Sequence, residues 1–409
     1  MQTTLRTNER PKAMRFVIVN HSYEEFLEEL YMRQRGLAEV SFVEQMSAYY
    51  ATLFGSADFY ANAIRELGHD VHEIVCNNSF AQKAWLREAS QGPGRPHTLS
   101  ADKRIRRLVS RGTQHLVRSF LGRSDVVSVE SGEAPFDNAR AFEVLLAQVK
   151  LWRPDVLYNQ SVYAFTDDQL RALKAFSGVL VGEHAAMPLP DGIDYRLYDL
   201  VVSSFPPTIE WLRLRGVRAE LVRLAFDPRV AAQIPPVPRK VRISFAGSFL
   251  PVHISRLRLV EAVAAEWTDM AVHGTVNVEL PQSSPLAGRI APALWGRDMY
   301  QLLRRSVITL NHHGDVPSFA NNMRLYEATG MGCLLVTDYK GNLGEMFEPD
   351  REVVAYHDAE DCCEKLRFYL DERNCAARER IMAAGHKRTL AEHTYGARMQ
   401  RLVELIRTI

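Results

Sequence analysis

Short apolar segments of strand type alternate with amphipathic helical patterns along almost the whole chain. The first segment, Met14–Asn20 (MRFVIVN), is apolar at nearly every position, which indicates a parallel strand buried on both faces. Helical patterns follow, Gly68 ends the last of them, and Asp70–Cys76 alternates like a second strand. This order of strand, helix, glycine and strand predicts a parallel, doubly wound α/β sheet.

The alternation stops once, at Gln233–Arg239 (QIPPVPR), where prolines stiffen the chain, and it starts again at Val241–Phe245. The chain of 409 residues also exceeds the roughly 250–300 residues that one hydrophobic core serves. The C-terminal stretch reads as helical, with a break near Gly385 and a restart near Tyr395. We therefore expect two Rossmann-like domains facing across a cleft, with a final helix crossing back to the first domain. The expected parts are an N-terminal domain at 1–234, a linker at 235–240, a C-terminal domain at 241–390 and the helix at 391–409.

The charges of the chain nearly cancel, because 50 Lys and Arg face 49 Asp and Glu and give a net charge of +1. This balance argues against a protein that wraps nucleic acid, and the 46% of hydrophobic residues argues against a disordered chain. The five cysteines have neither CxxC nor metal-site spacing, and no apolar run resembles a signal core or a membrane span. These features predict a cytoplasmic protein with reduced thiols.

One predicted helix, Asp102–Leu121, carries a face rich in arginine. Such a face fits a peripheral contact with anionic lipid at the inner side of the membrane, or with another polyanion. It also fits an ordinary solvated helix face, which we favour because the chain is nearly neutral overall.

The most informative segment lies in the second half, where Asn322, Arg324 and Glu327 fall within two turns of a predicted helix, Asn321–Met331. The start of this helix should face the carboxyl edge of the sheet, where free N–H groups favour phosphate. Arg324 suits a diphosphate as a forked donor, and Glu327 suits the two hydroxyls of a ribose. The alternative is a plain Arg–Glu pair three positions apart, and the spacing alone does not choose between the two.

A family resemblance rests on the same segment. Asn322-x-Arg324-x-Tyr326-Glu327-Ala328, followed by Gly330-x-Gly332-x-x-Leu335-x-x-Asp338, resembles the N-x-R-x-(F/Y)-E-A…G…D signature of CgeB-like glycosyltransferases of the spore maturation protein type. These proteins are related to the group 1, or GT4-like, glycosyltransferases with the GT-B fold, and the similarity is good over residues 239–409. The resemblance implies transfer of a sugar from a nucleotide-sugar donor to a hydroxyl of a saccharide, lipid or protein acceptor, without a metal or other cofactor.

The resemblance also implies a donor site in the second domain. Glu327 matches the ribose-binding glutamate of related retaining enzymes. Gly247 and Ser248 would let backbone amides approach the donor phosphates, and Arg256 belongs to the same part of the pattern. Phe319 stands where those enzymes carry a second glutamate near the sugar, so retention and inversion at the anomeric carbon both stay open.

Two adjacent histidines, His312 and His313, follow the predicted strand Val307–Leu310 and belong to the same edge. Paired histidines suggest a metal, but neighbouring side chains on extended backbone point opposite ways, and no spacing of Cys or carboxylates completes a site. We therefore favour a donor-binding loop and no metal, with the helix dipole and basic side chains stabilising the departing diphosphate.

The acceptor side is expected in the first domain. Glu183 and His184 follow the strand Gly178–Gly182, and His21 follows the first strand. Glu183 and His184 each suit a general base toward an acceptor hydroxyl in an inverting enzyme, whereas His184 suits a contact with the donor sugar in a retaining one. The resemblance to GT-B enzymes implies that His21 lies where the acceptor approaches and makes it a further catalytic candidate. Polar residues after a strand are equally often plain loop residues.

A glycosyltransferase whose two domains close around its substrates is therefore the leading hypothesis. A nucleotide-sugar epimerase of the same fold is an alternative, although no distinct set of acid and base residues stands out. A non-catalytic GT-B-like protein that binds a saccharide or acts as a scaffold is another, and Phe319 keeps it open.

Overall fold

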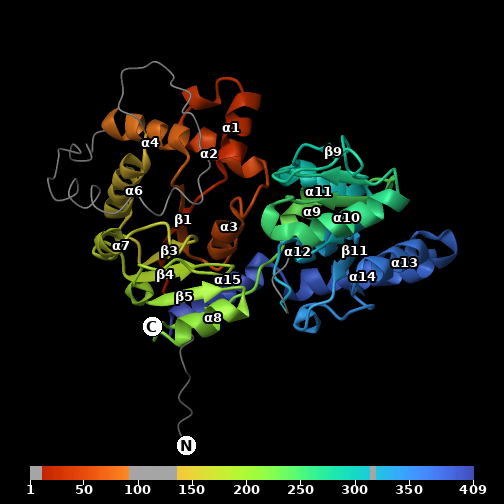
Figure 1. The fold of residues 1–409 in the computed structure, drawn as a ribbon. Coiled ribbons are helices and arrows are strands. Elements are labelled where there is room, and N and C mark those ends of the chain that lie inside the picture. Colours follow the sequence, from red (N-terminus) through yellow and green to blue (C-terminus); the bar gives the residue numbers. More distant parts are fainter. Residues whose placement is uncertain (1–11, 92–135, 314–318) are drawn as a thin grey trace, which may run out of the picture.

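The computed structural model describes residues 12–91, 136–313 and 319–409, which form two α/β domains lying side by side (Figure 1). The N-terminal sheet contains β1 (Arg15–Asn20), β2 (Asp70–Val75), β3 (Val156–Asn159), β4 (Val179–Glu183), β5 (Leu200–Ser203) and β6 (Ala219–Leu221). The C-terminal sheet contains β7 (Val241–Ala246), β8 (Ala271–His273), β9 (Ile290–Ala291), β10 (Ser306–Asn311), β11 (Leu334–Asp338) and β12 (Val354–Tyr356).

Both six-stranded sheets are parallel and have the strand orders β2-β1-β3-β4-β5-β6 and β12-β11-β10-β7-β8-β9. In each order the chain starts at an inner strand, moves to one edge and then returns past its starting strand to the other edge. This is the doubly wound arrangement predicted from the sequence, and it is confirmed for both domains.

Helices cover both sheets. In the first domain they are α1 (Glu24–Arg33), α2 (Phe42–Ala51), α3 (Phe59–Glu66), α4 (Ser79–Gln91), α6 (Asn138–Trp152), α7 (Asp167–Lys174), α8 (Pro206–Arg213) and α9 (Pro228–Gln233). The later helices are α10 (Ile254–Glu266), α11 (Gly296–Arg305), α12 (Arg324–Gly330), α13 (Ala359–Leu370), α14 (Cys375–Glu392) and α15 (Tyr395–Ile406). None of these described helices has the length and apolar character needed to cross a membrane. The basic helix expected at 102–121 falls outside the described residues.

The apolar run of β1 is buried on both faces, as the sequence predicted. Phe16 and Ile18 belong to the hydrophobic cluster on one side of the sheet, and Val17 and Val19 belong to the cluster on the other side. Because β1 also pairs with β2 and β3, its backbone polar groups are satisfied between two neighbours.

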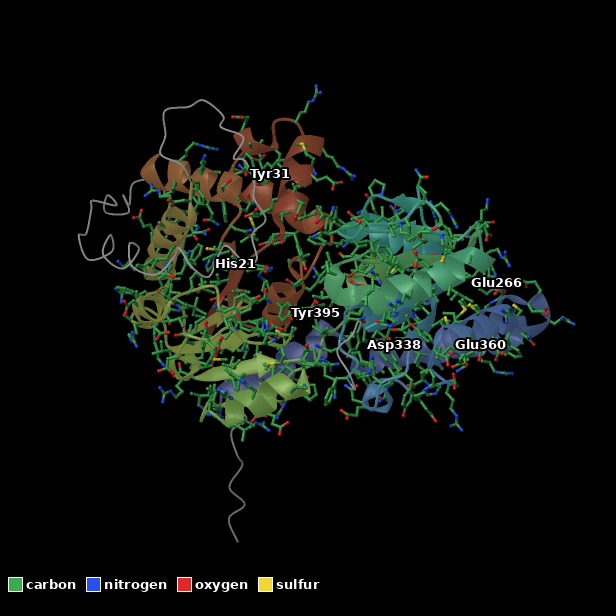
Figure 2. All side chains as sticks on the ribbon, in the orientation of Figure 1. His21, Tyr31, Glu266, Asp338, Glu360 and Tyr395 are labelled. Atoms are coloured by element: carbon green, nitrogen blue, oxygen red, sulfur yellow. The ribbon has the colours of Figure 1, made fainter. Side chains whose placement is uncertain are left out.

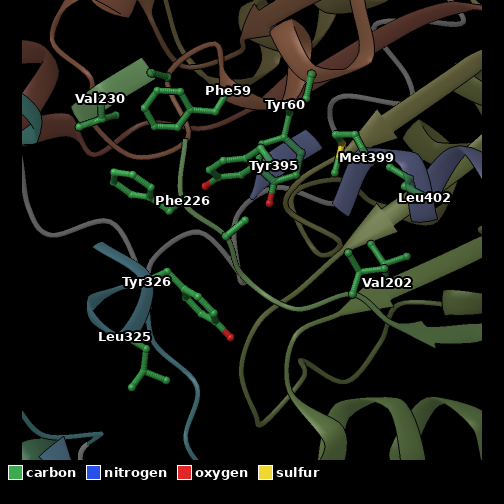
Figure 3. Packing of buried hydrophobic residues seen from close by; sticks show 14 of the residues in the cluster. Phe59, Tyr60, Val202, Phe226, Val230, Leu325, Tyr326, Tyr395, Met399 and Leu402 are labelled. Carbon is green, nitrogen blue, oxygen red and sulfur yellow. The ribbon is translucent and has the colours of Figure 1, made fainter. Parts of the chain in front are cut away.

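The last helix, α15, leaves the C-terminal domain and packs against the first one, as expected. At its start, the Tyr395 ring lies 4.8 Å from the Tyr60 ring and 5.4 Å from the Phe59 ring, measured between centroids (Figure 3). The same hydrophobic cluster includes Phe226 and Tyr326. The two domains therefore share a continuous apolar core beside the segment that links them.

The C-terminal region differs from the sequence-based expectation in two places. The predicted break near Gly385 is wrong, because α14 continues through it. A Cβ on Gly385 would lie 2.2 Å from the carbonyl oxygen of Glu352, so the glycine permits close packing and does not end the helix.

The helix expected from Asn321 begins later, at Arg324. The side chain of Asn321 donates to the carbonyl of Ala185 (2.7 Å), and that of Asn322 donates to Asn311 Oδ1 (2.8 Å). These hydrogen bonds hold the two asparagines in an irregular segment ahead of α12.

Candidate functional site

A cavity of about 540 Å³ lies between the two domains. The C-terminal domain lines it at the carboxyl ends of β7, β8 and β10 and along α12, where ligands of doubly wound sheets bind. From this domain come Phe245, Ala246, Gly247, Ser248, Leu250, Arg256, His273, Gly274, Thr275, Ala293, Leu294, Trp295, Gly296, Met299, Asn311, His312, Asn322, Met323, Arg324 and Glu327. From the N-terminal domain come Tyr23, Glu25, Leu53, Phe54 and Gly55.

Two glycine turns form one wall of the cavity. The N–H of Gly247, after β7, donates to the carbonyl of His273 at 3.0 Å. A Cβ on Gly274, after β8, would lie 1.9 Å from the carbonyl oxygen of Gly247. Gly274 is therefore required for this close approach of the two turns, a role that its sequence context did not reveal.

Arg256 connects two of the cavity-lining loops. From α10 its Nη1 donates to the carbonyl of Ser248 (2.9 Å) and its Nη2 donates to the carbonyl of His312 (3.1 Å). Arg256 thus positions the loops after β7 and β10 relative to each other.

His312 and His313 point to different surroundings. His312 lines the cavity, with its Nε2 3.4 Å from the hydroxyl of Ser255. His313 is buried behind the wall, where its backbone N–H and its Nδ1 bond to Asp338 Oδ1 at 3.0 and 2.6 Å. Burial alone would raise the pKa of Asp338, but the hydrogen bond from His313 and the nearby charges of His313, His312 and Lys340 lower it to about 2. The structure therefore brings His312 to the cavity and does not bring His313 there.

Arg324 and Glu327 form a largely buried ion pair on the cavity wall. Arg324 Nη1 lies 2.9 Å from Glu327 Oε2, and the side chains are only 16% and 12% exposed. Arg324 Nη2 also donates to the carbonyl of Ala246 (3.1 Å), and the Tyr300 hydroxyl donates to Glu327 Oε1 (3.5 Å). Burial raises the pKa of Glu327, while the Arg324 charge opposes that shift. Arg324 and Glu327 therefore form the plain Arg–Glu pair and also line the cavity, so the two interpretations of the sequence do not exclude each other.

Asn322 lies beside this pair on the same wall. It is held by a short series of amide contacts, in which Asn322 Nδ2 donates to Asn311 and Asn311 Nδ2 donates to the Thr337 hydroxyl (2.9 Å). These contacts connect the segment before α12 to the ends of β10 and β11.

Glu183, by contrast, does not line the cavity. Its Oε1 accepts from the Tyr60 hydroxyl (3.0 Å) and its Oε2 accepts from the Tyr158 hydroxyl (2.6 Å). Burial raises the pKa of this carboxyl group, and the two tyrosine hydrogen bonds oppose the shift.

The two candidate histidines of the first domain also lie away from the cavity. The His184 ring meets the Tyr163 ring edge-on at 5.1 Å, and desolvation lowers the pKa of His184 to about 4. His21 lies in the N-terminal domain with an exposed side chain, 6.0 Å from the Phe165 ring (Figure 2). His21, Glu183 and His184 are all described, and none lines this cavity.

Phe319, which stands where the related retaining enzymes carry a second glutamate, contacts the N-terminal domain. Its ring meets the Phe205 ring edge-on at 5.7 Å, close to the hydrogen bond between Asn321 and Ala185. Phe319 is absent from the described residues that line the cavity. Its side chain therefore contributes to the contact between the domains.

On the N-terminal side, the cavity is lined by residues that the sequence did not single out. The motifs and spacings of the sequence point to none of Tyr23, Glu25 and Phe54. Trp295, before α11, packs 4.9 Å from the Phe54 ring and donates its indole N–H to Glu29 Oε2 at 2.8 Å. Such contacts join segments far apart in the chain, so no spacing rule would have found them.

Comparison with known proteins places this geometry in context. Residues 256–404 match the family model described as glycosyl transferase-like. No curated protein sequence matches the chain significantly.

Several solved glycosyltransferase structures share the architecture of both domains. One is a glycosyltransferase from Rickettsia africae, with 11% identity, a TM-score of 0.54 and coverage of 96% of this chain and 97% of the other. Another is HepE from Anabaena in complex with UDP and glucose, with 11% identity, a TM-score of 0.52 and coverage of 97% and 100%. A third is AviGT4, from avilamycin A biosynthesis, with 14% identity, a TM-score of 0.51 and coverage of 96% and 97%. At these identities the likeness shows the fold, and the fold is GT-B.

Proposed function

We propose that this protein is a glycosyltransferase that moves a sugar from a nucleoside-diphosphate sugar to an acceptor hydroxyl. The observation that carries this proposal is the interdomain cavity, in which the Arg324–Glu327 pair and the turn at Gly247–Ser248 lie on one wall. The match to a glycosyl transferase-like family model supports it, as do proteins of this fold that bind UDP and UDP-glucose. The motif carried by α12 supports the CgeB-like subtype.

Arg324 would bind the diphosphate of the donor. A guanidinium has five N–H donors, so the contacts of Arg324 with Glu327, Ala246 and the Met299 sulfur leave others for phosphate oxygens. Transfer forms a bond between the acceptor oxygen and the anomeric carbon and breaks the bond from that carbon to the diphosphate. Arg324 would stabilise the negative charge that develops on the leaving group.

Glu327 would accept hydrogen bonds from the ribose hydroxyls. It accepts most strongly as a carboxylate, whose two oxygens can each take one hydroxyl hydrogen, and burial disfavours that form. The adjacent Arg324 charge opposes the effect of burial on the Glu327 pKa, so the two residues act as one unit. Phosphate binding by Arg324 and ribose binding by Glu327 would then place the sugar near the N-terminal wall.

We further propose that transfer needs no metal and takes place in the cytoplasm. Arg324 supplies positive charge at the cavity, which is the task that a divalent cation performs in other transferases. All five cysteines are described and unpaired, which suits a reducing compartment. Activity that persists after treatment with excess chelator would support the first point, and activity restored only by Mg²⁺ or Mn²⁺ would contradict it.

The test of function is the product formed from a panel of nucleotide sugars without added acceptor. A transferase is expected to release free sugar and nucleoside diphosphate slowly, because water replaces the acceptor. An altered sugar still attached to its nucleotide would identify an epimerase of this fold. Binding without any product, also in the presence of saccharide, lipid and peptide acceptors, would identify a non-catalytic protein.

A further inference from the structure

The two walls of the cavity carry different chemistry. The groups proposed to hold the donor all belong to the C-terminal domain. The N-terminal wall consists of Tyr23, Glu25, Leu53, Phe54 and Gly55, and these described residues include neither Lys nor Arg. A wall with one carboxylate and no cation disfavours an anionic second substrate.

Tyr23 has a large aromatic side chain that is exposed to solvent. It is 64% exposed, although it lines a cavity and an aromatic ring normally gains from burial. Its orientation is fixed by the Phe54 ring at 5.7 Å and the Trp295 ring at 6.0 Å. A supported ring with an accessible surface suits the apolar C–H face of a sugar ring.

Glu25 is the second unexplained group on this wall. Of the two carboxylates that line the cavity in the described chain, Glu327 is paired with Arg324, whereas the side chain of Glu25 has no hydrogen-bond or ion-pair partner among the described residues. An acidic residue in the first turn of α1 favours the helix, but Glu24 occupies the same turn and does not line the cavity. A carboxylate accepts strong hydrogen bonds from hydroxyl groups.

From these observations we infer that Tyr23 and Glu25 form the acceptor subsite and that the acceptor is a neutral saccharide. The sugar ring packs on Tyr23, and one of its hydroxyls donates a hydrogen bond to Glu25. This inference rests on the proposed sugar transfer. Of the three acceptor classes considered, saccharide, lipid and protein, it selects the saccharide. It also replaces His21, Glu183 and His184 as the acceptor-side residues.

The test uses the full-length protein and the nucleotide sugar that it turns over. Transfer of labelled sugar is measured to neutral methyl glycosides and disaccharides, to undecaprenyl phosphate and to a serine-containing peptide. We expect the neutral saccharides to accept the sugar. Tyr23→Ala and Glu25→Gln should each raise the acceptor KM roughly 10-fold, with a smaller change in kcat and no change in the Kd of the nucleoside diphosphate.

A further variant acts as the control. Glu24→Gln changes the same helical turn outside the cavity, so it should retain the wild-type KM. The inference is overturned if only the lipid phosphate or the peptide accepts sugar, or if Tyr23→Ala and Glu25→Gln keep the wild-type KM. It is equally overturned if Tyr23→Ala weakens nucleoside diphosphate binding, because the Tyr23 ring would then contact the base of the donor nucleotide and not the acceptor. A wild-type protein that binds no nucleoside diphosphate would instead contradict the proposed function.

Discussion

Arg324 Nη1 lies 2.9 Å from Glu327 Oε2, and both side chains line the cavity between the domains. A pair of this kind can stabilise the fold, bind a ligand or do both. The two roles separate when Arg324 is removed alone and then together with the Glu327 charge, because a buried charge is costly only when its partner is missing.

We expect Arg324→Ala to lower the free energy of unfolding by about 2–4 kcal/mol, because it leaves the Glu327 carboxylate buried without a cation. Adding Glu327→Gln should recover most of that loss, since the charge is then gone. Nucleoside diphosphate binding should stay lost in the double variant. Urea unfolding and calorimetric titration of the three proteins measure both quantities, and recovery of binding in the double variant would show that the pair has only a structural role.

Arg256 is expected to act by positioning loops. Arg256→Ala removes the donors to the carbonyls of Ser248 and His312, so the loops after β7 and β10 lose their connection. Donor affinity should fall roughly 10-fold or more. Arg258→Ala, on the exposed side of the same helix, is the matched control and should bind the donor like the wild type. Equal affinities for the two variants would contradict this role.

Gly274→Ala tests the close approach of the two glycine turns. The added methyl would meet the Gly247 carbonyl oxygen at 1.9 Å, so one turn must move. We expect a loss of about 1–3 kcal/mol in unfolding free energy together with weaker donor binding. Gly344→Ala, where an added Cβ meets nothing within 4 Å, should leave both unchanged. A Gly274→Ala protein with wild-type stability would mean that the turns are not in contact.

A buried carboxyl group away from the cavity gives a pH-dependent prediction. Glu73, on β2, is 6% exposed, and burial, reinforced by Asp58, raises its pKa well above the ordinary value. The folded state therefore holds this proton at pH values where the unfolded chain has lost it. Stability should fall as the pH rises above the unfolded pKa of about 4.5, by up to about 1.4 kcal/mol per pH unit until the folded pKa is reached.

The matching variant is Glu73→Gln, which should lose that part of the pH dependence. Unfolding free energies of both proteins at pH 5.5 and pH 7.5 provide the comparison. A wild-type slope no steeper than that of the variant would show that Glu73 is ionised in the folded protein.

The fold could be predicted because its strongest signals are local. The apolar run Phe16–Val19 can be buried only between two covering layers, so its composition already indicates a central parallel strand. Residues directly after strands, such as Gly247 and His312, follow from the same rule and do line the cavity. Gly385 misled the prediction because glycine marks both helix ends and close contacts, and only the neighbouring Glu352 shows which applies.

The acceptor side could not be predicted in this way. Glu183 is the last residue of β4, but its side chain is covered by Tyr60 and Tyr158, which come from other parts of the chain. Tyr23 and Glu25 resemble any residues at the start of an amphipathic helix, and their importance depends on Trp295 of the other domain. The sequence shows which residues lie at the carboxyl edge of a sheet. The residues of the other domain that face this edge can be identified only in the structure.

The central claim is that the cavity binds a nucleoside-diphosphate sugar through the Arg324–Glu327 pair. The most direct measurement is calorimetric titration of the full-length protein with UDP, GDP, ADP, CDP and dTDP and with their glucose conjugates. We predict saturable binding of at least one nucleotide and its sugar, weakened at least roughly 10-fold by Arg324→Ala and unchanged by Arg305→Ala, which alters an exposed arginine of α11 outside the cavity. Absence of binding across the whole panel, or equal affinity in the wild type and Arg324→Ala, would contradict the claim.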